Sequence, residues 1–199
     1  MENQLKKITS KFRSSSKSLS KPANLTVSAM LLALSIVLKY FENMSMGFLG
    51  TNLIKIGFSL IPIVAAAILY GPVVSGIIGG LNDIIGYLLA PQGAYIPGFT
   101  ISMILVGVIY GVAFYKENVK LTRVIAAEVI ITFLINILLG GVWFMVFYGF
   151  SLKKAFIIRG AKELIDLPIS ILIDFFLYKA LFRIPEAKRI IRSSEVPET

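Results

Sequence analysis

The sequence predicts an all-α integral membrane protein built as a bundle of six transmembrane helices. Three observations lead to this prediction: 56% of the 199 residues are hydrophobic, only 16% are charged, and the mean hydropathy is +0.81. Soluble domains usually carry about a quarter charged residues. Apolar runs also recur along the whole chain, and about 20 helical residues span the hydrocarbon core of a bilayer. Most of the protein therefore lies in lipid.

Polar and turn-forming residues between the apolar runs predict where each helix begins and ends. We expect helices over residues 24–41, 55–70, 72–90, 97–115, 119–148 and 153–182. Gly71 permits a chain reversal and Pro72 suits a first helical position, so the second and third helices should form a hairpin. The last two helices are longer than a perpendicular span needs, so we expect them to tilt. Pro168 should kink the sixth.

The basic residues predict the orientation of the bundle. Lys and Arg cluster in residues 1–23, in the link between the fourth and fifth helices, and in residues 183–199, which all fall on one side of a six-span protein. Because basic residues accumulate in cytoplasmic segments, we expect two cytoplasmic tails, 1–23 and 183–199, around a transmembrane domain of residues 24–182. The net charge of +9 then reflects topology, with attraction to anionic membrane lipid as a consequence. The tails lack a nucleic-acid module, so no nucleic-acid partner is expected.

The composition excludes several kinds of chemistry. The sequence has no Cys and no His, which removes disulfides, thiolate nucleophiles and the usual zinc ligands. It has no G-x-x-x-x-G-K-[ST] loop, so the chain does not hydrolyse ATP by that route. We therefore expect no metal, no cofactor and no enzyme. Membrane carboxylates such as Asp83 and Glu128 keep an intramembrane enzyme as a weaker alternative, and a purely structural membrane protein is another.

Polar side chains follow one face of the sixth predicted helix. At helical spacing the sequence has Arg159, Lys162, Glu163, Asp166, Ser170 and Asp174. Charged groups that face lipid are costly, so this face must meet a cavity or other helices. We interpret Arg159 and Lys162, toward the outer end, as part of an outward-facing site for an anion. Internal pairing, such as Arg159 with Glu163, is the alternative. We interpret Lys39, also near the outer end, as reaching the lipid headgroups.

The fifth and third helices carry similar but milder polar faces. The fifth has Glu128, Thr132, Asn136, Gly140 and Trp143 along one side, and the third has Gly76, Gly79, Gly80, Asp83 and Tyr87. Trp143, the only tryptophan, could belong to an interfacial belt or form a stacking wall for a flat ligand. The glycines permit close helix contact. Asp83 could serve packing or receive the N–H groups of a heteroaromatic ring.

The segment from Pro91 to Phe99 is rich in Gly and Pro and predicts turns at the outer side. Together with residues 43–51 it could cover a cavity with aromatic side chains. Tyr95 and Phe99 are the aromatic residues of this predicted lid.

These stretches resemble a known family. Residues 53–102 hold the Gly71–Pro72 hairpin, Asp83 and the segment G-A-Y-x-P-G-F-T at 93–100, and they are similar to the substrate-binding S components of the energy-coupling factor (ECF) vitamin transporters, in particular the folate group. Further similarity lies in residues 107–115 and 136–149, and at Arg159, Lys162 and Pro168. The resemblance covers almost the whole chain.

The resemblance implies a six-helix S component in a bacterial cell membrane that captures folate outside the cell with high affinity. It implies delivery through a shared transmembrane coupling protein, the T component, and two ABC ATPases, which hydrolyse the ATP. The family's coupling contact is a small-xxx-small motif on the first helix, matched by Ala29 and Ala33. The alternative ligand is another vitamin or precursor, such as a pyridoxine-like or pyrimidine compound.

Folate suits the polar residues of the predicted outer half. Its pterin is flat and forms hydrogen bonds, and its glutamate tail carries two carboxylates. We expect the pterin near Asn136, Trp143 and Asp83. We expect the tail near Lys55, Arg159 and Lys162, with Tyr95 and Phe99 in the closing segment.

Overall fold

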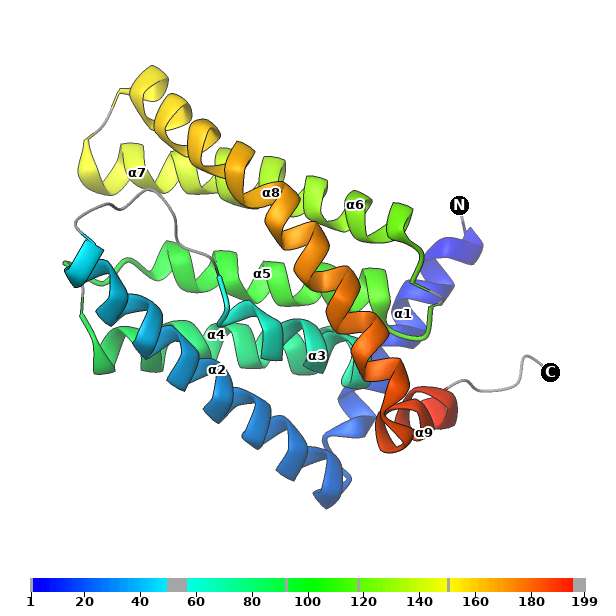
Figure 1. Cartoon of the computed structure of the whole chain (residues 1–199). Helices are drawn as coiled ribbons and strands as arrows, with labels where there is room; N and C mark the ends of the chain where they lie inside the picture. The colour runs from blue at the N-terminus through cyan, green and yellow to red at the C-terminus, as the bar shows by residue number, and fades with distance from the viewer. Residues whose placement is uncertain (1, 50–56, 92, 118, 150, 195–199) are drawn as a thin grey trace.

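The computed structural model describes residues 2–49, 57–91, 93–117, 119–149 and 151–194, which form helices and short connections without a strand (Figure 1). In chain order the elements are α1 (Glu2–Ser18), α2 (Pro22–Leu49), α3 (Leu60–Tyr70), α4 (Pro72–Leu89), α5 (Pro97–Phe114), α6 (Leu121–Ile130), η1 (Ile131–Leu139), α7 (Gly140–Tyr148), α8 (Leu152–Arg183) and α9 (Pro185–Ser194). The predicted all-α fold is confirmed. The predicted helices correspond to α2, α3, α4, α5, the run α6–η1–α7, and α8.

Four helices in the described part of the chain are long and apolar enough to cross a bilayer, namely Pro22–Glu42, Pro72–Leu89, Pro97–Phe114 and Leu121–Phe147. The other two predicted spans, α3 and α8, do not combine this length with this apolar character. The apolar helix α3 has 11 residues and begins at Leu60, not at the predicted residue 55, because Phe58 and Ser59 form a turn. The 32-residue α8 is long enough, but charged residues interrupt its apolar character.

The helices run back and forth between two ends of the bundle (Figure 1). We call one the α1 end: it holds α1, α9, the turn between α3 and α4, and the connection between α5 and α6. We call the other the far end: it holds the connections between α4 and α5 and between α7 and α8. In Figure 1, α1 lies across the α1 end, transverse to α5 and α6. No helix was predicted for the segments that form α1 and α9.

The α3–α4 hairpin forms at the predicted dipeptide. Gly71 has a φ of 87°, and a Cβ atom there would lie 2.8 Å from the ring of Tyr115, so both the backbone and the space favour glycine. Pro72 then begins α4. The predicted close helix contact at the glycines of α4 is confirmed, and the partner is α5: a Cβ atom at Gly79 would lie 2.5 Å from the Met103 carbonyl oxygen. The backbones of α4 and α5 therefore lie in close contact.

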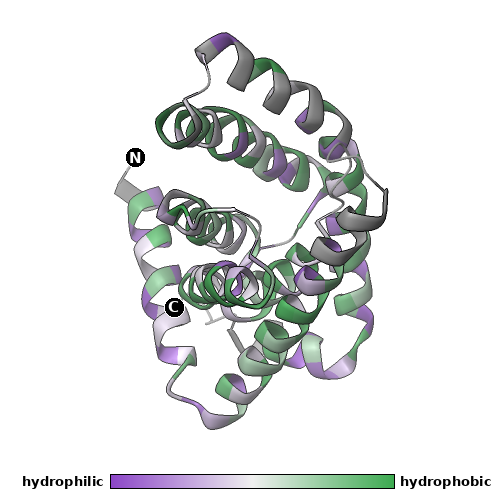
Figure 2. Cartoon of the chain, turned by 90° about the vertical axis from the view of Figure 1, so that its left-hand side faces the viewer, coloured by the Kyte–Doolittle hydropathy of each residue, from purple (hydrophilic) through white to green (hydrophobic). Residues whose placement is uncertain are grey.

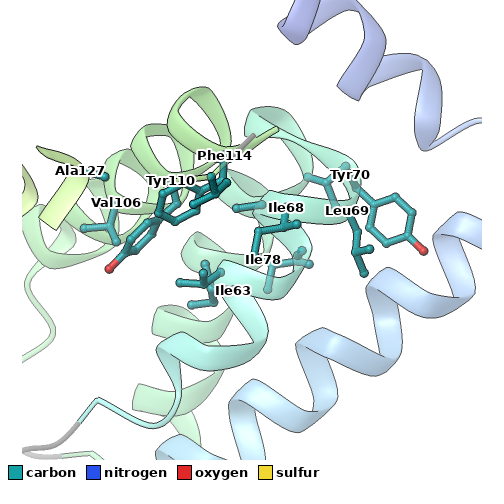
Figure 3. Packing of buried hydrophobic residues seen from close by; sticks show 14 of the residues in the cluster. Ile63, Ile68, Leu69, Tyr70, Ile78, Val106, Tyr110, Phe114 and Ala127 are labelled. Carbon is teal, nitrogen blue, oxygen red and sulfur yellow. The ribbon is translucent and has the colours of Figure 1, made fainter. Parts of the chain in front are cut away.

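The apolar core centres on α3, whose residues are buried from Pro62 to Tyr70 (Figure 3). Ile63 and Ile68 of α3 pack in one cluster with Ile78 of α4, Val106 of α5 and Ala127 of α6. Large apolar side chains on the outer helices stay exposed instead, among them Met30, Leu34, Phe133, Leu172 and Phe176. A helix that is apolar all round belongs inside a membrane bundle, and exposed apolar side chains face lipid.

Hydropathy separates α1 from the bundle. In Figure 2 the helix that begins at the N-terminus carries hydrophilic residues along much of its length, whereas hydrophobic residues dominate the helices of the bundle. Because α1 is polar, the apolar runs that mark the membrane helices do not include it. Hydrogen bonds and ion pairs hold it on the bundle.

Candidate functional site

The far half of α2 turns three polar side chains toward the bundle. Ser35, Lys39 and Glu42 are spaced by four and three residues and so share one face of the helix. The Ser35 hydroxyl donates a hydrogen bond of 2.7 Å to the Ser59 carbonyl oxygen. The Glu42 carboxylate accepts from the Ser59 backbone N–H at 2.7 Å and from its hydroxyl at 2.9 Å. These bonds hold the start of α3 against α2.

Lys39 forms an ion pair with α4, so the prediction that it reaches the lipid headgroups is wrong. Its Nζ lies 2.7 Å from Asp83 Oδ1, with both side chains largely buried. The lysine stem can reach this far because α4 has no side chain at Gly86, where a Cβ atom would lie 2.6 Å from Lys39 Cδ. The second Asp83 oxygen accepts from the Thr100 hydroxyl at 2.8 Å, and Thr100 shares a 2.6 Å hydrogen bond with Tyr95.

The Asp83 carboxylate therefore joins α2, α4 and the start of α5. This geometry favours the packing alternative for Asp83, since each of its oxygens already has a partner within the chain. Tyr95 lies in the connection before α5, and its ring is 5.1 Å from that of Tyr87. Tyr87 in turn donates to the Gly93 carbonyl oxygen at 2.8 Å. The same network thus holds the described part of the predicted lid on α4.

Trp143 of α7 packs on the first turns of α5. Its indole lies against Gly98, where a Cβ atom would collide with the ring, and its Nε1 donates to Ser102 Oγ at 3.2 Å. Phe99 and Phe144 meet edge to face at 6.1 Å between ring centroids. The indole therefore faces α5 and not the surrounding lipid, which argues against an interfacial belt, and the stacking wall for a flat ligand stays a prediction. We call Phe99, Trp143 and Phe144 the aromatic wall.

The polar faces of the last two predicted helices meet each other. Asn136 of η1 donates to Glu163 of α8 at 2.8 Å, and Glu163 is 5% exposed. Closer to the α1 end, Tyr110 of α5 donates to Glu128 of α6, and Asp174 of α8 interacts with the same carboxylate. For these four polar residues, Asn136, Glu163, Glu128 and Asp174, the prediction that their faces point into the bundle is confirmed.

The three bases predicted to meet the ligand's carboxylates, Lys55, Arg159 and Lys162, are described only in part, and we call them the basic mouth. Lys55 lies outside the described residues. Arg159 and Lys162 belong to α8, one on each side of Gly160, but their side chains are not among those described. Pairing of Arg159 with Glu163 and contact of either base with an anion therefore stay predictions.

The far end thus combines an aromatic wall with hydrogen-bonding groups. Asn136 and Trp143 lie seven residues apart on η1–α7 and contact α8 and α5 respectively, while Asp83 and Tyr95 are both joined to Thr100 of α5. Such a set suits a flat heterocycle that both stacks and forms hydrogen bonds. In the described part of the chain, no group of three or more His, Cys, Asp or Glu residues is placed to hold a metal ion.

The sequence analysis assigned no role to several residues of this arrangement, among them Ser35, Glu42, Ser59, Thr100, Ser102 and Phe144. A signal existed for α2, where the spacing of Ser35, Lys39 and Glu42 gives a polar face across a membrane helix. No local signal marked Ser102, since its role comes from the position of Trp143 on another helix.

Comparisons with known proteins place the chain in a family. Residues 23–185 match the family described as "ECF transporter, substrate-specific component". The chain is 34% identical over 164 residues to the folate transporter FolT of Clostridium novyi (strain NT), which covers 82% of this chain and 92% of that protein. It is 32% identical over 155 residues to the folate transporter FolT of Leuconostoc mesenteroides, covering 75% and 80% of the two chains.

A solved structure supports the same assignment. The crystal structure of FolT bound with folic acid superposes with a TM-score of 0.68 at 32% sequence identity, covering 79% of this chain and 93% of that one. The family match spans all six bundle helices that the sequence predicted. The chain therefore belongs to the substrate-specific components of the ECF transporters.

Proposed function

We propose that this chain is the folate-binding subunit of an ECF importer, which captures folate outside the cell. The observation that carries the proposal is the similarity to two proteins named folate transporter FolT over at least three quarters of the chain, together with the likeness to FolT bound with folic acid. As a family member the chain is a transport subunit, not an enzyme.

The arrangement at the far end supports a pterin ligand. The aromatic wall offers stacking surfaces, and Asn136 offers an amide seven residues from Trp143. In our proposal the pterin lies near Asn136 and Trp143, with Tyr95 and Phe99 closing the site. Asp83, whose two oxygens are bound within the chain, supports the site by holding Tyr95 through Thr100. The two carboxylates of the glutamate tail meet the bases Lys55, Arg159 and Lys162, because charge-assisted hydrogen bonds are stronger than neutral ones.

Delivery of folate requires partners, for which α2 is the proposed contact. Ala29 and Ala33 are exposed one turn apart, beside the exposed side chains of Met30 (67%) and Leu34 (50%). Within the apolar stretch of α2 between Pro22 and Glu42, only 11% of the residues are buried by the rest of this chain. We propose that the T component packs on this face and that two ABC ATPases drive release. Both termini then lie in the cytoplasm, in keeping with the basic residues of the α1 end.

Ultraviolet absorbance and mass spectrometry of the small molecule extracted from purified protein test the ligand. Recovery of folate, about one per chain, is expected. Recovery of a pyridine or pyrimidine vitamin in its place would contradict the folate assignment while leaving the family intact.

Copurification tests the partner face. Trp at Ala29 and Ala33 should abolish capture of the T component while the isolated variant still binds folate, because close backbone contact drives association in lipid. Trp at Leu172, a lipid-exposed position of α8, is the control and should leave capture unchanged. Normal capture by the double Trp variant would exclude this interface.

A further inference from the structure

Helix α1 lies outside the family match, which begins at residue 23, yet it is fixed to the bundle. The Ser15 hydroxyl is fully buried and accepts from the backbone N–H groups of Val73 at 3.0 Å and Val74 at 3.4 Å. It thereby caps the start of α4, where the first N–H groups of a helix need an external acceptor. Lys11 donates to the Val112 carbonyl oxygen near the end of α5 at 2.8 Å.

A second set of contacts joins α1 to the connection between α5 and α6. The Glu117 carboxylate lies 2.8 Å from both Lys7 and Lys11, and 2.7 Å from Arg123 at the start of α6. Lys116 donates to the Ser14 hydroxyl at 2.8 Å. Contacts to α4, to α5 and to the α5–α6 connection define both the position and the rotation of α1. Unlike a freely moving tail, it presents a constant face to its surroundings.

The contacts of α1 place it beside the ends of two helices that are long and apolar enough to cross a membrane. Val73 lies in the first turn of α4 and Val112 lies near the end of α5, and both helices are long and apolar enough to span a membrane. A helix held at these two points therefore sits at the level where the spans end. Because α1 runs transverse to α5 and α6 (Figure 1), it runs parallel to the plane of a membrane that these two helices cross. This is the placement of an interfacial helix.

The sides of α1 that do not contact the bundle have the composition expected of a helix at the membrane surface. The docked face holds Lys7, Lys11, Ser14, Ser15 and Ser18. Beside it runs an apolar edge with Leu5 (63% exposed), Ile8 (37% exposed) and the half-buried Phe12. Away from it runs an edge with the exposed bases Lys6, Arg13 and Lys17.

We propose that α1 binds anionic phospholipid headgroups along the edge that carries Arg13 and Lys17, with Leu5 and Ile8 in contact with the acyl boundary. Charge complementarity selects this occupant, since one edge of the helix carries exposed bases and a separate edge carries apolar side chains, as in a helix that lies at a membrane surface. The polar docking contacts then have a function: they hold the lipid-binding edge parallel to the membrane and link headgroup binding to the ends of α4 and α5.

The experiment uses the full chain in uncharged detergent with a polarity-sensitive dye at a cysteine placed at Leu5. The chain has no other cysteine, so labelling is specific. Phosphatidylglycerol is titrated in, and phosphatidylcholine is titrated in parallel. We expect a blue shift of dye emission that saturates with phosphatidylglycerol, is weak with phosphatidylcholine and weakens in high salt.

The variant R13Q/K17Q removes two exposed bases from the edge, and K120Q/R189Q removes two exposed bases from the same end of the bundle but outside α1. The first should raise the half-saturating phosphatidylglycerol concentration about tenfold or more, and the second less than about twofold. Thermal unfolding without added lipid should be the same for all proteins. Equal titration of R13Q/K17Q and the parent, or equal weakening in the control, overturns the proposal. So does loss of T component capture in R13Q/K17Q with unchanged lipid titration, which would assign the edge to a protein partner.

Discussion

The ammonium group of Lys39 lies 2.7 Å from a carboxylate oxygen of Asp83, so one ion pair joins α2 to α4 in the far half of the bundle. The second oxygen of Asp83 accepts from Thr100, which extends the link to α5. A lysine and an aspartate that would each be costly in lipid are thereby satisfied by each other. The pair fixes α2, whose opposite face is the proposed coupling surface.

Replacing Lys39 with Met should destabilise the unliganded protein by about 2 to 3 kcal/mol, because it leaves the Asp83 carboxylate buried without its counter-ion. The double variant K39M/D83L should recover most of this loss, since it removes both charges. Unfolding in detergent, followed by circular dichroism, measures the free energies. A double variant less stable than K39M would show that Asp83 stabilises the bundle independently of Lys39.

Gly98 should tolerate no side chain. A Cβ atom at this position would collide with the Trp143 indole, so Gly98→Ala must displace the aromatic wall and should cost about 2 kcal/mol of stability and weaken folate binding. Gly160→Ala is the matched control, because a Cβ atom there has no neighbour within 4 Å among the described atoms and alanine favours a helix. If G98A and G160A behave alike, the contact between Trp143 and α5 does not position the wall.

The contacts of α1 with Glu117 should become weaker as the pH falls into the acidic range. Burial raises the pKa of this carboxyl, but hydrogen bonds from Lys11 and Lys7 and the nearby charges outweigh it and lower the pKa to about 2 from the usual 4.5. A carboxyl whose pKa is lower in the folded protein stabilises the fold above pH 4.5, and this contribution is lost as the pH falls from 4.5 to about 2. Thermal unfolding of E117Q should therefore show a weaker pH dependence than the parent in this window. Identical profiles would show that Glu117 is not ionised within the contact.

The basic mouth predicts different losses for folate and for a pterin without the glutamate tail. Alanine at the responsible base, Arg159 or Lys162, should weaken folate binding by about 2 kcal/mol, or about 30-fold, and should affect the truncated pterin much less. Lys153→Ala is the control, because this exposed base lies in the same helix. If both variants are folded and bind folate like the parent, the tail is held elsewhere.

Much of the bundle could be predicted from the sequence because lipid imposes a simple rule on apolar runs and polar faces. The hairpin at Gly71 and Pro72 and the inward direction of Glu128 and Asp174 follow from local chemistry and helical spacing alone. Asn136 and Trp143 were found as members of one polar face, although their partners, Glu163 and Ser102, depend on how helices pack.

The remaining features depend on tertiary contacts that a single sequence does not reveal. From the sequence, the Lys39 side chain can extend to lipid headgroups or to a carboxylate. It pairs with Asp83 because α4 packs close to α2 at Gly86, which has no side chain to block the lysine. Helix α1 is polar, so hydropathy gave no signal for it, and it is fixed by the buried Ser15 and by Glu117, which is 102 residues away. The π-helical turn of η1 also had no local signal, since Ile131–Leu139 reads as ordinary apolar helix.

Calorimetric titration of the purified full chain with folate, without ATP or partners, tests the central claim most directly. The chain has no ATP-binding loop of the P-loop type, so binding should need no nucleotide. We predict one folate per chain, with tighter binding than for pyridine or pyrimidine vitamins under the same conditions. The account would be contradicted if a folded protein bound one of those smaller vitamins and gave no measurable heat of binding when titrated with folate.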